Sequence, residues 1–316
     1  MMKFAIVGCG NIAQRSAIPA LINSGLSSIS VCIDINPQRG KEIFEKFSLP
    51  FETSLQEVYN KYIFDAVYIS TPNASHKEII FSAAINGKHV ICQKSIVTDL
   101  EEAIDVINIC RQYNIGLYEG FMYQFHTQHE FVKNLILNGE IGTPFHFQAW
   151  FGFPPISPQD FRYEKSFGGG AILDAGAYTI HSARHFFNCE PISIHSILEK
   201  EGHEVEVRGS AMLDFGKSRT AHLVFGFNNM YQNKYIIWGT QGVITLDRAF
   251  AIPPDVESIL TLEKQGLKKE YIMQPCNHFI EEIRYFIKNI NSPELHLQWQ
   301  NEILNQMKVI SQMSKI

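Results

Sequence analysis

The amino-acid sequence predicts an α/β protein with two domains, the first built on a parallel sheet and the second an α+β domain with a mostly antiparallel sheet. The chain has 316 residues, enough for two hydrophobic cores. In its first third, short apolar runs alternate with helical patterns, as in parallel strands joined by crossover helices. After Gly120, strand patterns follow one another too closely for crossover helices, which favours antiparallel pairing. We expect domains at 1–120 and 121–316, with the C-terminal helices able to pack back on the first domain.

Each element of the first domain follows from its local pattern. Apolar runs predict strands over 3–8, 29–34, 65–70, 88–93 and 115–120. The segments between them predict helices over 12–24, 37–47, 54–61, 74–86 and 99–113. Thr98 followed by Glu101 resembles a capping box at the start of the last helix, and Gly87 and Gly116 suit helix ends that precede strands.

The second domain is rich in aromatic residues and in period-two alternation. In FHFQAWFGF (145–153), Phe145, Phe147, Phe151 and Phe153 share one face, which we expect to pack on helices. Further strands are predicted over 192–199, 205–215, 219–227, 234–239, 242–247, 258–264 and 268–274. The C-terminal segment predicts two helices, 277–290 and 298–313.

Composition excludes several classes of protein. Hydrophobic residues make up 45% and charged residues 19% of the chain, as in an ordinary globular protein, and its net charge is −5. Without a stripe of Lys and Arg, binding to nucleic acid or an anionic membrane is not expected. The segment 16–33 is too polar to span a bilayer, and no signal-peptide pattern follows Lys3, so we expect a cytoplasmic protein. The six cysteines show no C-x-x-C spacing and are interpreted as reduced packing residues.

The stretch KFAIVGCGNIA predicts a phosphate-binding loop. It places Gly8-x-Gly10-x-x-Ala13, with Asn11 and Ile12 inside the motif, after a strand and at the start of a helix. Small residues there let the backbone approach a pyrophosphate that the helix N-terminus attracts. Asp34, at the end of the second strand, can accept from an adenine-ribose diol. We therefore predict a dinucleotide-binding Rossmann domain.

The choice between NAD and NADP depends on two residues. The carboxylate of Asp34 repels a 2′-phosphate and so favours NAD. Arg39, five residues later, can weaken that preference because a guanidinium attracts a phosphate. Both cofactors stay open, with NAD favoured.

The carboxyl ends of the next two strands carry further candidates for contact with the cofactor. One strand ends in Ser70, Thr71, Pro72 and Asn73, followed by His76, and the next ends in Gln93 and Lys94. Ligands of such sheets bind at this edge. The alternative for the first group is a helix start capped by Asn73 or Ser75, with His76 in solvent. The alternative for Lys94 is an ammonium that only extends from a strand end into water.

A helix after the run GGG (168–170) carries polar side chains on one face. Asp174, Tyr178 and His181 are spaced by four and three residues, so a regular helix turns them the same way. A carboxylate, a phenol and an imidazole so placed make a plausible wall of a substrate site, or a partly solvated polar face.

These motifs together resemble the glucose-fructose oxidoreductase, inositol dehydrogenase and rhizopine-catabolism family of NAD(P)-dependent oxidoreductases. The matching pieces cover nearly the whole chain and are VGCGNIA, STPNASH, ICQKSIVTDLEEA, EGFMYQFHTQH, NGEIGTP and GGGAILDAGAY. The resemblance implies a nucleotide-binding domain and a second domain with an open sheet that often assembles homodimers or homotetramers.

The resemblance also assigns roles to residues. Lys94 corresponds to the active-site lysine of the family, although Ser95 replaces the usual proline and leaves open whether the bond between them is cis. Tyr178 stands where polyol dehydrogenases often have histidine, which is similar to glucose-fructose oxidoreductases, dihydrodiol dehydrogenases and nucleotide-sugar 3-ketoreductases. The run from FGFPPISPQDFRYEK to the glycines looks most like the last group, although His181 departs from the arginine expected there.

By this resemblance, hydride passes between NAD(P)H and a sugar carbonyl, with Tyr178 as the proton donor beside Lys94. Asp174 would orient sugar hydroxyls or Lys94, and Tyr123 and His181 would contact substrate. Arg162 and Tyr163 would hold a nucleotide diphosphate, or else lie in an ordinary solvated loop. Free aldoses, polyols and dihydrodiols are alternative substrates, and a cofactor-binding sensor without turnover is an alternative of another class.

A metal site is not expected. His126 and His129 are spaced as possible ligands beside Glu130, but the pattern offers no further ligand. We interpret these histidines as flanking a site or an interface.

Overall fold

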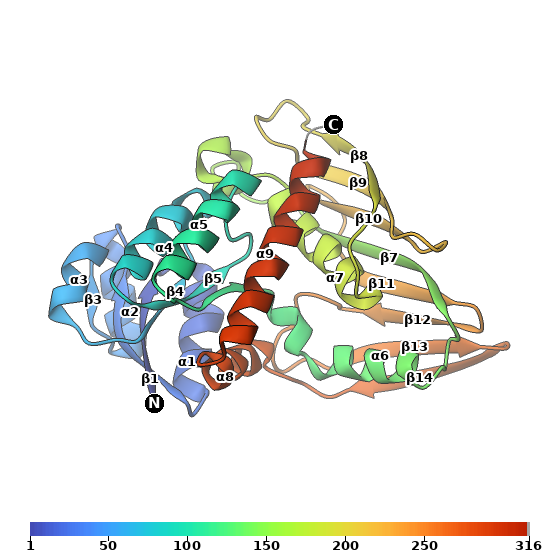
Figure 1. The fold of residues 1–316 in the computed structure, drawn as a ribbon, viewed down its shortest axis with the longest axis horizontal. Helices are drawn as coiled ribbons and strands as arrows, with labels where there is room; N and C mark the ends of the chain where they lie inside the picture. The colour runs from blue at the N-terminus through green and yellow to red at the C-terminus, as the bar shows by residue number, and fades with distance from the viewer. Residues whose placement is uncertain (315–316) are drawn as a thin grey trace. The chain divides into compact units, whose positions relative to one another are not determined.

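The computed structural model describes residues 1–314 of the chain (Figure 1). The chain divides into two compact units. The first contains Met1–Phe121 and Phe279–Leu304, and the second contains Met122–His278 and the residues from Asn305 onward. Helix α9 (Pro293–Met313) therefore contributes residues to both units.

The first unit contains a parallel sheet of six strands in the order β3-β2-β1-β4-β5-β6. The strands are β1 (Met2–Val7), β2 (Ser27–Ile33), β3 (Phe51–Glu52), β4 (Ala66–Ile69), β5 (His89–Gln93) and β6 (Leu117–Gly120). The five predicted strands are confirmed within about two residues at each end. The two-residue strand β3 was not predicted, because so short a segment has no measurable period.

Helices connect these strands as crossovers. They are η1 (Ala13–Ala17), α1 (Ile18–Asn23), α2 (Pro37–Phe47), α3 (Leu55–Lys61), η2 (Asn73–Ser75), α4 (His76–Ile85) and α5 (Leu100–Gln112). The predicted capping box is wrong by one residue. Asp99 is the N-cap of α5 and accepts from the N–H of Glu102, whose carboxylate accepts from the N–H and hydroxyl of Thr98. A carboxylate at 99 caps as well as a hydroxyl at 98, so the pattern alone did not separate the two positions.

The C-terminal helices add aromatic side chains to the core of the first unit. Helix α8 (His278–Asn289) brings Phe286 against Phe4 of β1 and Tyr118 of β6, with ring centroids 6.3 and 6.2 Å apart. Trp299 of α9 stacks on Phe286 at 5.8 Å and meets the edge of Tyr118 at 5.2 Å. This part of the core therefore joins the first strand of the sheet to residues near the end of the chain.

The second unit contains an eight-stranded sheet in the order β14-β13-β12-β11-β7-β10-β9-β8. Its pairings are antiparallel except for that of β7 with β10. The strands are β7 (Pro144–Phe153), β8 (Ser193–Glu199), β9 (Arg208–Asp214), β10 (Thr220–Phe227), β11 (Gln232–Gly239), β12 (Gly242–Asp247), β13 (Ser258–Lys264) and β14 (Leu267–Met273). The predicted mostly antiparallel sheet is confirmed.

Helices α6 (Thr127–Leu137) and α7 (Ala177–Phe187) cover one face of this sheet (Figure 1). Phe147 of β7 stacks on Phe186 of α7, and Tyr235 of β11 contacts both Phe186 and His129 of α6. Helix packing is thus confirmed for Phe147, and Phe151 likewise meets Tyr178 of α7. Shorter helical segments are η3 (Met122–Phe125), η4 (Phe161–Tyr163), η5 (Lys165–Phe167) and η6 (Ile172–Gly176).

The helices and the cysteines were also compared with what the sequence predicted. No helix within residues 1–314 combines the length and the hydropathy that crossing a bilayer requires. The six cysteines are free thiols, and four of them, Cys9, Cys32, Cys92 and Cys110, are buried, as predicted for packing residues.

Candidate active site

The phosphate loop in the first unit is shaped by two glycines with different roles. Gly8 has φ +91°, and a Cβ there would lie 2.7 Å from Cγ2 of Thr71 and 2.8 Å from the carbonyl carbon of Ser70. A side chain at this position would therefore separate the loop from the end of β4. A Cβ on Gly10 would meet nothing within 4 Å, so this glycine borders open space. Open space beside the start of a helix fits a pyrophosphate that approaches the backbone closely.

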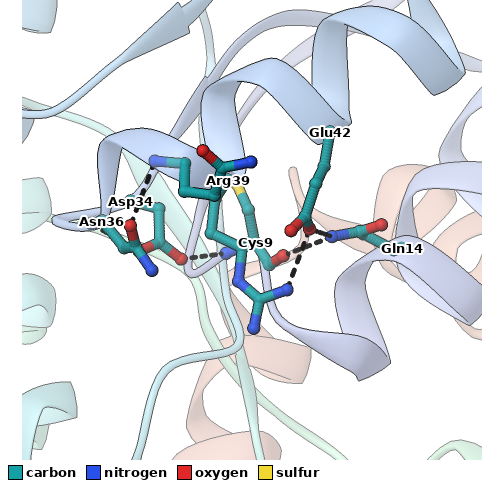
Figure 2. A network of polar contacts seen from close by, with 7 residues as sticks. Cys9, Gln14, Asp34, Asn36, Arg39 and Glu42 are labelled. Carbon is teal, nitrogen blue, oxygen red and sulfur yellow. Dashed lines mark hydrogen bonds and ion pairs between the residues drawn. The ribbon is translucent and has the colours of Figure 1, made fainter.

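Asp34 follows β2 and contacts the phosphate loop directly. Its Oδ2 accepts from the N–H of Cys9 at 2.8 Å, and its Oδ1 accepts from the N–H of Asn36 at 2.9 Å (Figure 2). An ionised carboxylate has about four acceptor positions, so a ribose hydroxyl can still bind. Asn11 and Ile12 are exposed where the helix begins, whereas Ala13 is fully buried.

Arg39 lies on α2 and is engaged by a carboxylate of its own helix. Its Nη1 donates to Oε2 of Glu42 at 2.9 Å, and the same oxygen accepts from Nε2 of Gln14 at 2.9 Å (Figure 2). Gln14 also donates to the carbonyl of Cys9 at 3.0 Å. The sequence did not indicate Gln14 or Glu42, because residues 28 positions apart share no local pattern.

The loop after β4 is held to the phosphate loop and by a hydrogen bond of its own. The Ser70 hydroxyl donates to the carbonyl of Gly8 at 2.8 Å, and Ser75 donates to the carbonyl of Pro72 at 2.8 Å. Thr71, Pro72 and Asn73 are half-buried. A helix does start here, as predicted, with Ser75 in the N-cap position of α4, but the Ser75 side chain makes no capping hydrogen bond.

His76 is fully buried, which contradicts its placement in solvent. Its Nε2 lies 2.9 Å from the carbonyl oxygen of Thr71, and its Nδ1 lies 3.0 and 3.2 Å from those of Ser95 and Ile96. Burial lowers the pKa of the imidazole, although the three carbonyls oppose this shift. His76 therefore joins the loop after β4 to the loop after β5.

Lys94 directly follows β5, at the carboxyl edge of the sheet. The side chain is half-buried, and the peptide bond between Lys94 and Ser95 is cis. Hydrogen bonds within the first unit hold residues on both sides of Lys94. Nε2 of the preceding Gln93 donates to the hydroxyl of Tyr68 at 2.6 Å, and the N–H of Ile96 donates to Glu119 at 2.9 Å.

Tyr178 lies in the second unit among aromatic side chains. Its ring is 5.2 Å from Phe151 and 6.0 Å from Tyr123, both edge-on, and 5.9 Å from Phe250. Its hydroxyl lies 3.4 Å from Sδ of Met122, a weak acceptor. The side chain is 6% exposed, so its packing leaves the phenol little freedom to move.

Tyr123 connects Tyr178 to His181. Its hydroxyl lies 2.7 Å from Nδ1 of His181, and its ring is edge-on to both residues. Burial, then His185, Arg184 and Lys133, hold the pKa of His181 well below its ordinary value. A neutral His181 therefore faces Tyr123 at neutral pH. The structure brings together these three predicted residues.

Asp174 has a partner within its own unit that the sequence did not indicate. Its Oδ2 accepts from Nε of Arg162 at 2.6 Å, while Nη1 of Arg162 donates to Asp160 at 3.1 Å. Burial alone would lower the pKa of Arg162, but Asp174 and Asp160 outweigh it and raise the pKa. Asp174 belongs to η6, a π-helical segment that precedes α7, so the regular spacing assumed for one helical face does not hold from Asp174 to Tyr178.

Tyr163 anchors the loop that carries Arg162. Its hydroxyl donates to Asn228 at 2.6 Å, and its ring stacks on His203 at 4.7 Å. The glycines that follow pack tightly on this loop, since a Cβ on Gly169 would lie 2.5 Å from the carbonyl oxygen of Arg162. The glycine run is therefore required for close backbone approach.

The predicted metal-site alternative concerns histidines that have other contacts. His129 is buried, with Nδ1 3.0 Å from the Tyr235 hydroxyl and Nε2 2.9 Å from the carbonyl of Ala249. Nδ1 of His126 accepts from the N–H of Gln128 at 3.3 Å. Among residues 1–314, no group of three or more His, Cys, Asp or Glu side chains is arranged to hold a metal ion.

Family models match both parts of the chain. Residues 2–121 match the oxidoreductase family with an NAD-binding Rossmann fold, and residues 129–245 match the GFO/IDH/MocA C-terminal domain.

Relatives with named activities span nearly the full length. The dTDP-3,4-didehydro-2,6-dideoxy-alpha-D-glucose 3-reductase of Actinomadura kijaniata is 30% identical, over 98% of this chain and 93% of that protein. The enzyme of the same name from Saccharopolyspora spinosa is 29% identical, over 92% and 88%. A D-xylose 1-dehydrogenase (NADP(+)) from Haloferax volcanii is 25% identical, over 98% and 95%.

Among solved structures, a 3-ketoreductase from Actinomadura kijaniata in complex with NADP and TDP-benzene is similar, with a TM-score of 0.93 and 29% identity. The match covers 99% of this chain and 97% of that chain. The phosphate loop, Asp34 and the open space beside Gly10 fit a nicotinamide dinucleotide, in agreement with these matches. The chain belongs to the GFO/IDH/MocA family and is an NAD(P)-dependent oxidoreductase of the sugar-metabolising kind.

Proposed function

We propose that this enzyme reduces the C3 carbonyl of a dTDP-linked deoxyketosugar. The observation that carries the proposal is the near full-length similarity to enzymes named as dTDP-sugar 3-reductases, at 29% and 30% identity. The sequence also keeps a lysine at the carboxyl end of β5 and a tyrosine on α7, the two side chains that the proposed reaction needs.

The bound nicotinamide supplies the hydride, and the residues of the chain supply the rest. As hydride adds to the carbonyl carbon, the electron pair of the C=O bond moves to oxygen, which takes a proton from the phenol of Tyr178. The Lys94 ammonium stabilises the charge that develops on that oxygen and favours the phenolate that remains. Water then returns a proton to the phenolate. The proposal requires both side chains to reach the same carbonyl oxygen in the complex with substrate.

Arg162 is proposed to bind the diphosphate of the nucleotide. Asp174 and Asp160 each accept one of the five N–H donors of the guanidinium and set its orientation. The donors that they do not use can bind phosphate oxygens. In this proposal Asp174 positions Arg162, and Tyr163 holds the loop through Asn228.

A second candidate is oxidation of a free sugar. It is favoured by the D-xylose 1-dehydrogenase of Haloferax volcanii, which matches 98% of this chain at lower identity. Incubating the protein with NADH or NADPH and dTDP-linked ketosugars, then with NAD or NADP and free aldoses, separates the two. Turnover of free aldoses alone would contradict the proposed function. A thermal-shift series with thymidine diphosphate tests recognition of the nucleotide independently of turnover.

We also propose that copies of the chain form a homodimer or homotetramer through the uncovered face of the second sheet. Strand register places apolar side chains that are 44% to 76% exposed on this face, namely Ile197, Met212, Val224, Trp238, Ile259 and Ile272. A row of this kind is typical of an interface. Sedimentation of the purified chain tests the assembly, and a monomer at every concentration would contradict it. Location in the cytoplasm stays a prediction.

A further inference from the structure

The end of β2 carries more negative charge than the nucleotide-binding motif alone requires. Asp34 occupies the position that binds the adenine ribose, and Glu42 lies on the following helix. Both carboxylates are tied to the same residue of the phosphate loop. Asp34 accepts from the N–H of Cys9 at 2.8 Å, and Glu42 reaches the carbonyl of Cys9 through Gln14. Glu42 is therefore held close to the phosphate loop even though its side chain is 38% exposed.

Glu42 also pairs with Arg39, a cation on the same helix that could otherwise attract a 2′-phosphate. Nη1 of Arg39 donates to Oε2 of Glu42 at 2.9 Å. Hydrogen bonds from Gln14 and then Arg39 lower the pKa of Glu42, so this carboxylate is ionised at neutral pH. A partly exposed ion pair contributes little to stability. Its effect here is on charge, because the carboxylate offsets the guanidinium that would otherwise attract phosphate.

A 2′-phosphate would add about two negative charges at this place. It would meet the carboxylate of Asp34 and would have to compete with that of Glu42 for Arg39. A ribose 2′-hydroxyl avoids both costs, because it can donate to Asp34 and does not need Arg39. Arg39 keeps N–H donors that Glu42 does not use, but the carboxylate offsets its charge and so weakens its attraction for a 2′-phosphate.

We propose that Glu42 is a cofactor-specificity residue which, together with Asp34, makes this enzyme select NAD(H) over NADP(H). The inference deepens the proposed function by naming the cofactor, and it depends only on the dinucleotide site of that function. It separates this chain from the Actinomadura kijaniata 3-ketoreductase seen with NADP and from relatives named for NADP(+).

The test measures the dissociation constants of NADH and NADPH for the full chain, by nicotinamide fluorescence without any sugar. The unmodified protein is expected to bind NADH about tenfold or more tightly than NADPH. Glu42→Gln keeps the size of the side chain and removes its charge. It is expected to tighten NADPH binding about fivefold or more, with NADH binding changed less than about twofold. Arg39→Ala placed in the Glu42→Gln protein is expected to abolish that gain.

Glu45→Gln is the matched control, since Glu45 lies on the same helix and pairs with Lys41 at 3.8 Å without reaching the phosphate loop. It makes the same change of charge and is expected to leave the ratio of the two dissociation constants unchanged. Glu42→Ala repeats the test if the glutamine variant does not fold. The inference would be overturned if the unmodified protein bound NADPH as tightly as NADH. It would also be overturned if the ratio of the two dissociation constants were the same in both Glu42 variants as in the unmodified protein. Because no sugar is present, failure to reduce a ketosugar would leave this result standing.

Discussion

The phenol oxygen of Tyr123 lies 2.7 Å from Nδ1 of His181, and the Tyr123 ring is edge-on to Tyr178 with centroids 6.0 Å apart. This hydrogen bond fixes the ring of Tyr123, and ring packing then restricts Tyr178 from the side. His181 therefore acts on the proposed proton donor through Tyr123. The replacement of the expected arginine by a neutral imidazole keeps this contact free of a formal charge at neutral pH.

Tyr178→Phe is expected to lower kcat about a hundredfold or more, because it removes the proposed proton while keeping the ring contacts. The dissociation constant of the nicotinamide cofactor should change little. Steady-state kinetics and cofactor titration measure the two effects. Tyr123→Phe is the comparison, and its loss in kcat should be about tenfold or less, since it removes only a positioning hydrogen bond. Equal losses in both variants would assign no special role to Tyr178.

Lys94→Met is expected to lower kcat by a similar factor, about a hundredfold or more, because no ammonium then stabilises the developing alkoxide. Cofactor affinity should be nearly retained. Lys77→Met serves as the control, since Lys77 pairs with Asp105 at 2.7 Å on the surface of the same unit. Unchanged turnover in the Lys94 variant would remove this residue from the mechanism.

Arg162→Lys is expected to raise KM for a dTDP-linked sugar about tenfold or more, with a smaller change in kcat. Lysine keeps the charge, but it cannot contact two carboxylates and a diphosphate with one planar group. The same substitution at Arg208, which pairs with Glu201 in the same unit, should leave KM unchanged. If KM is insensitive to Arg162, the diphosphate binds elsewhere.

Glu282→Gln tests a buried carboxyl group on α8. Glu282 is 0% exposed, and neither carboxyl oxygen has a hydrogen-bond partner among the described residues. Burial raises its pKa to about 8. An unfolded glutamate titrates near pH 4.3, so between roughly pH 4 and 8 the folded chain holds a proton that the unfolded chain releases. The contribution of Glu282 to the free energy of unfolding therefore falls as the pH rises through this range.

The glutamine variant stays neutral and should not show this fall. Above about pH 8 it should exceed the original protein in free energy of unfolding by on the order of a few kcal/mol, and near pH 4 the two should agree. Urea unfolding at both pH values measures the difference. Glu281→Gln, at an exposed residue paired with Arg284, should show no such pH dependence. A destabilised Glu282 variant at high pH would show that the carboxylate has a partner in solution.

Residues placed at strand ends were predictable from the sequence. The alternation of short apolar runs with helical patterns predicted five parallel strands in the first domain. Parallel strands bring their carboxyl ends to one edge of the sheet. That reasoning located Gly8, Asp34 and Lys94 from local patterns alone. The alternation in FHFQAWFGF likewise predicted that Phe147 and Phe151 are buried, whereas Phe145 and Phe153 are only half-buried.

Contacts between distant segments were not predictable. The Asp174–Arg162 pair depends on how the glycine run folds back on its loop, and the π-helical segment before α7 has no sequence period of its own. The burial of Glu282 on α8 could not be predicted for a different reason. Glu282 directly precedes the core residue Ile283, and a helical pattern does not reveal whether the neighbouring position reaches water.

The buried imidazole of His76 has a mechanical consequence for this enzyme. It bridges the backbone at Thr71 and the backbone at Ser95 and Ile96, with each contact at 3.2 Å or less. Any displacement of one loop must therefore be accommodated by the ring that packs between the two. The loop that follows β4 and the loop that follows β5 are thus linked through one buried side chain as well as through the pairing of their strands.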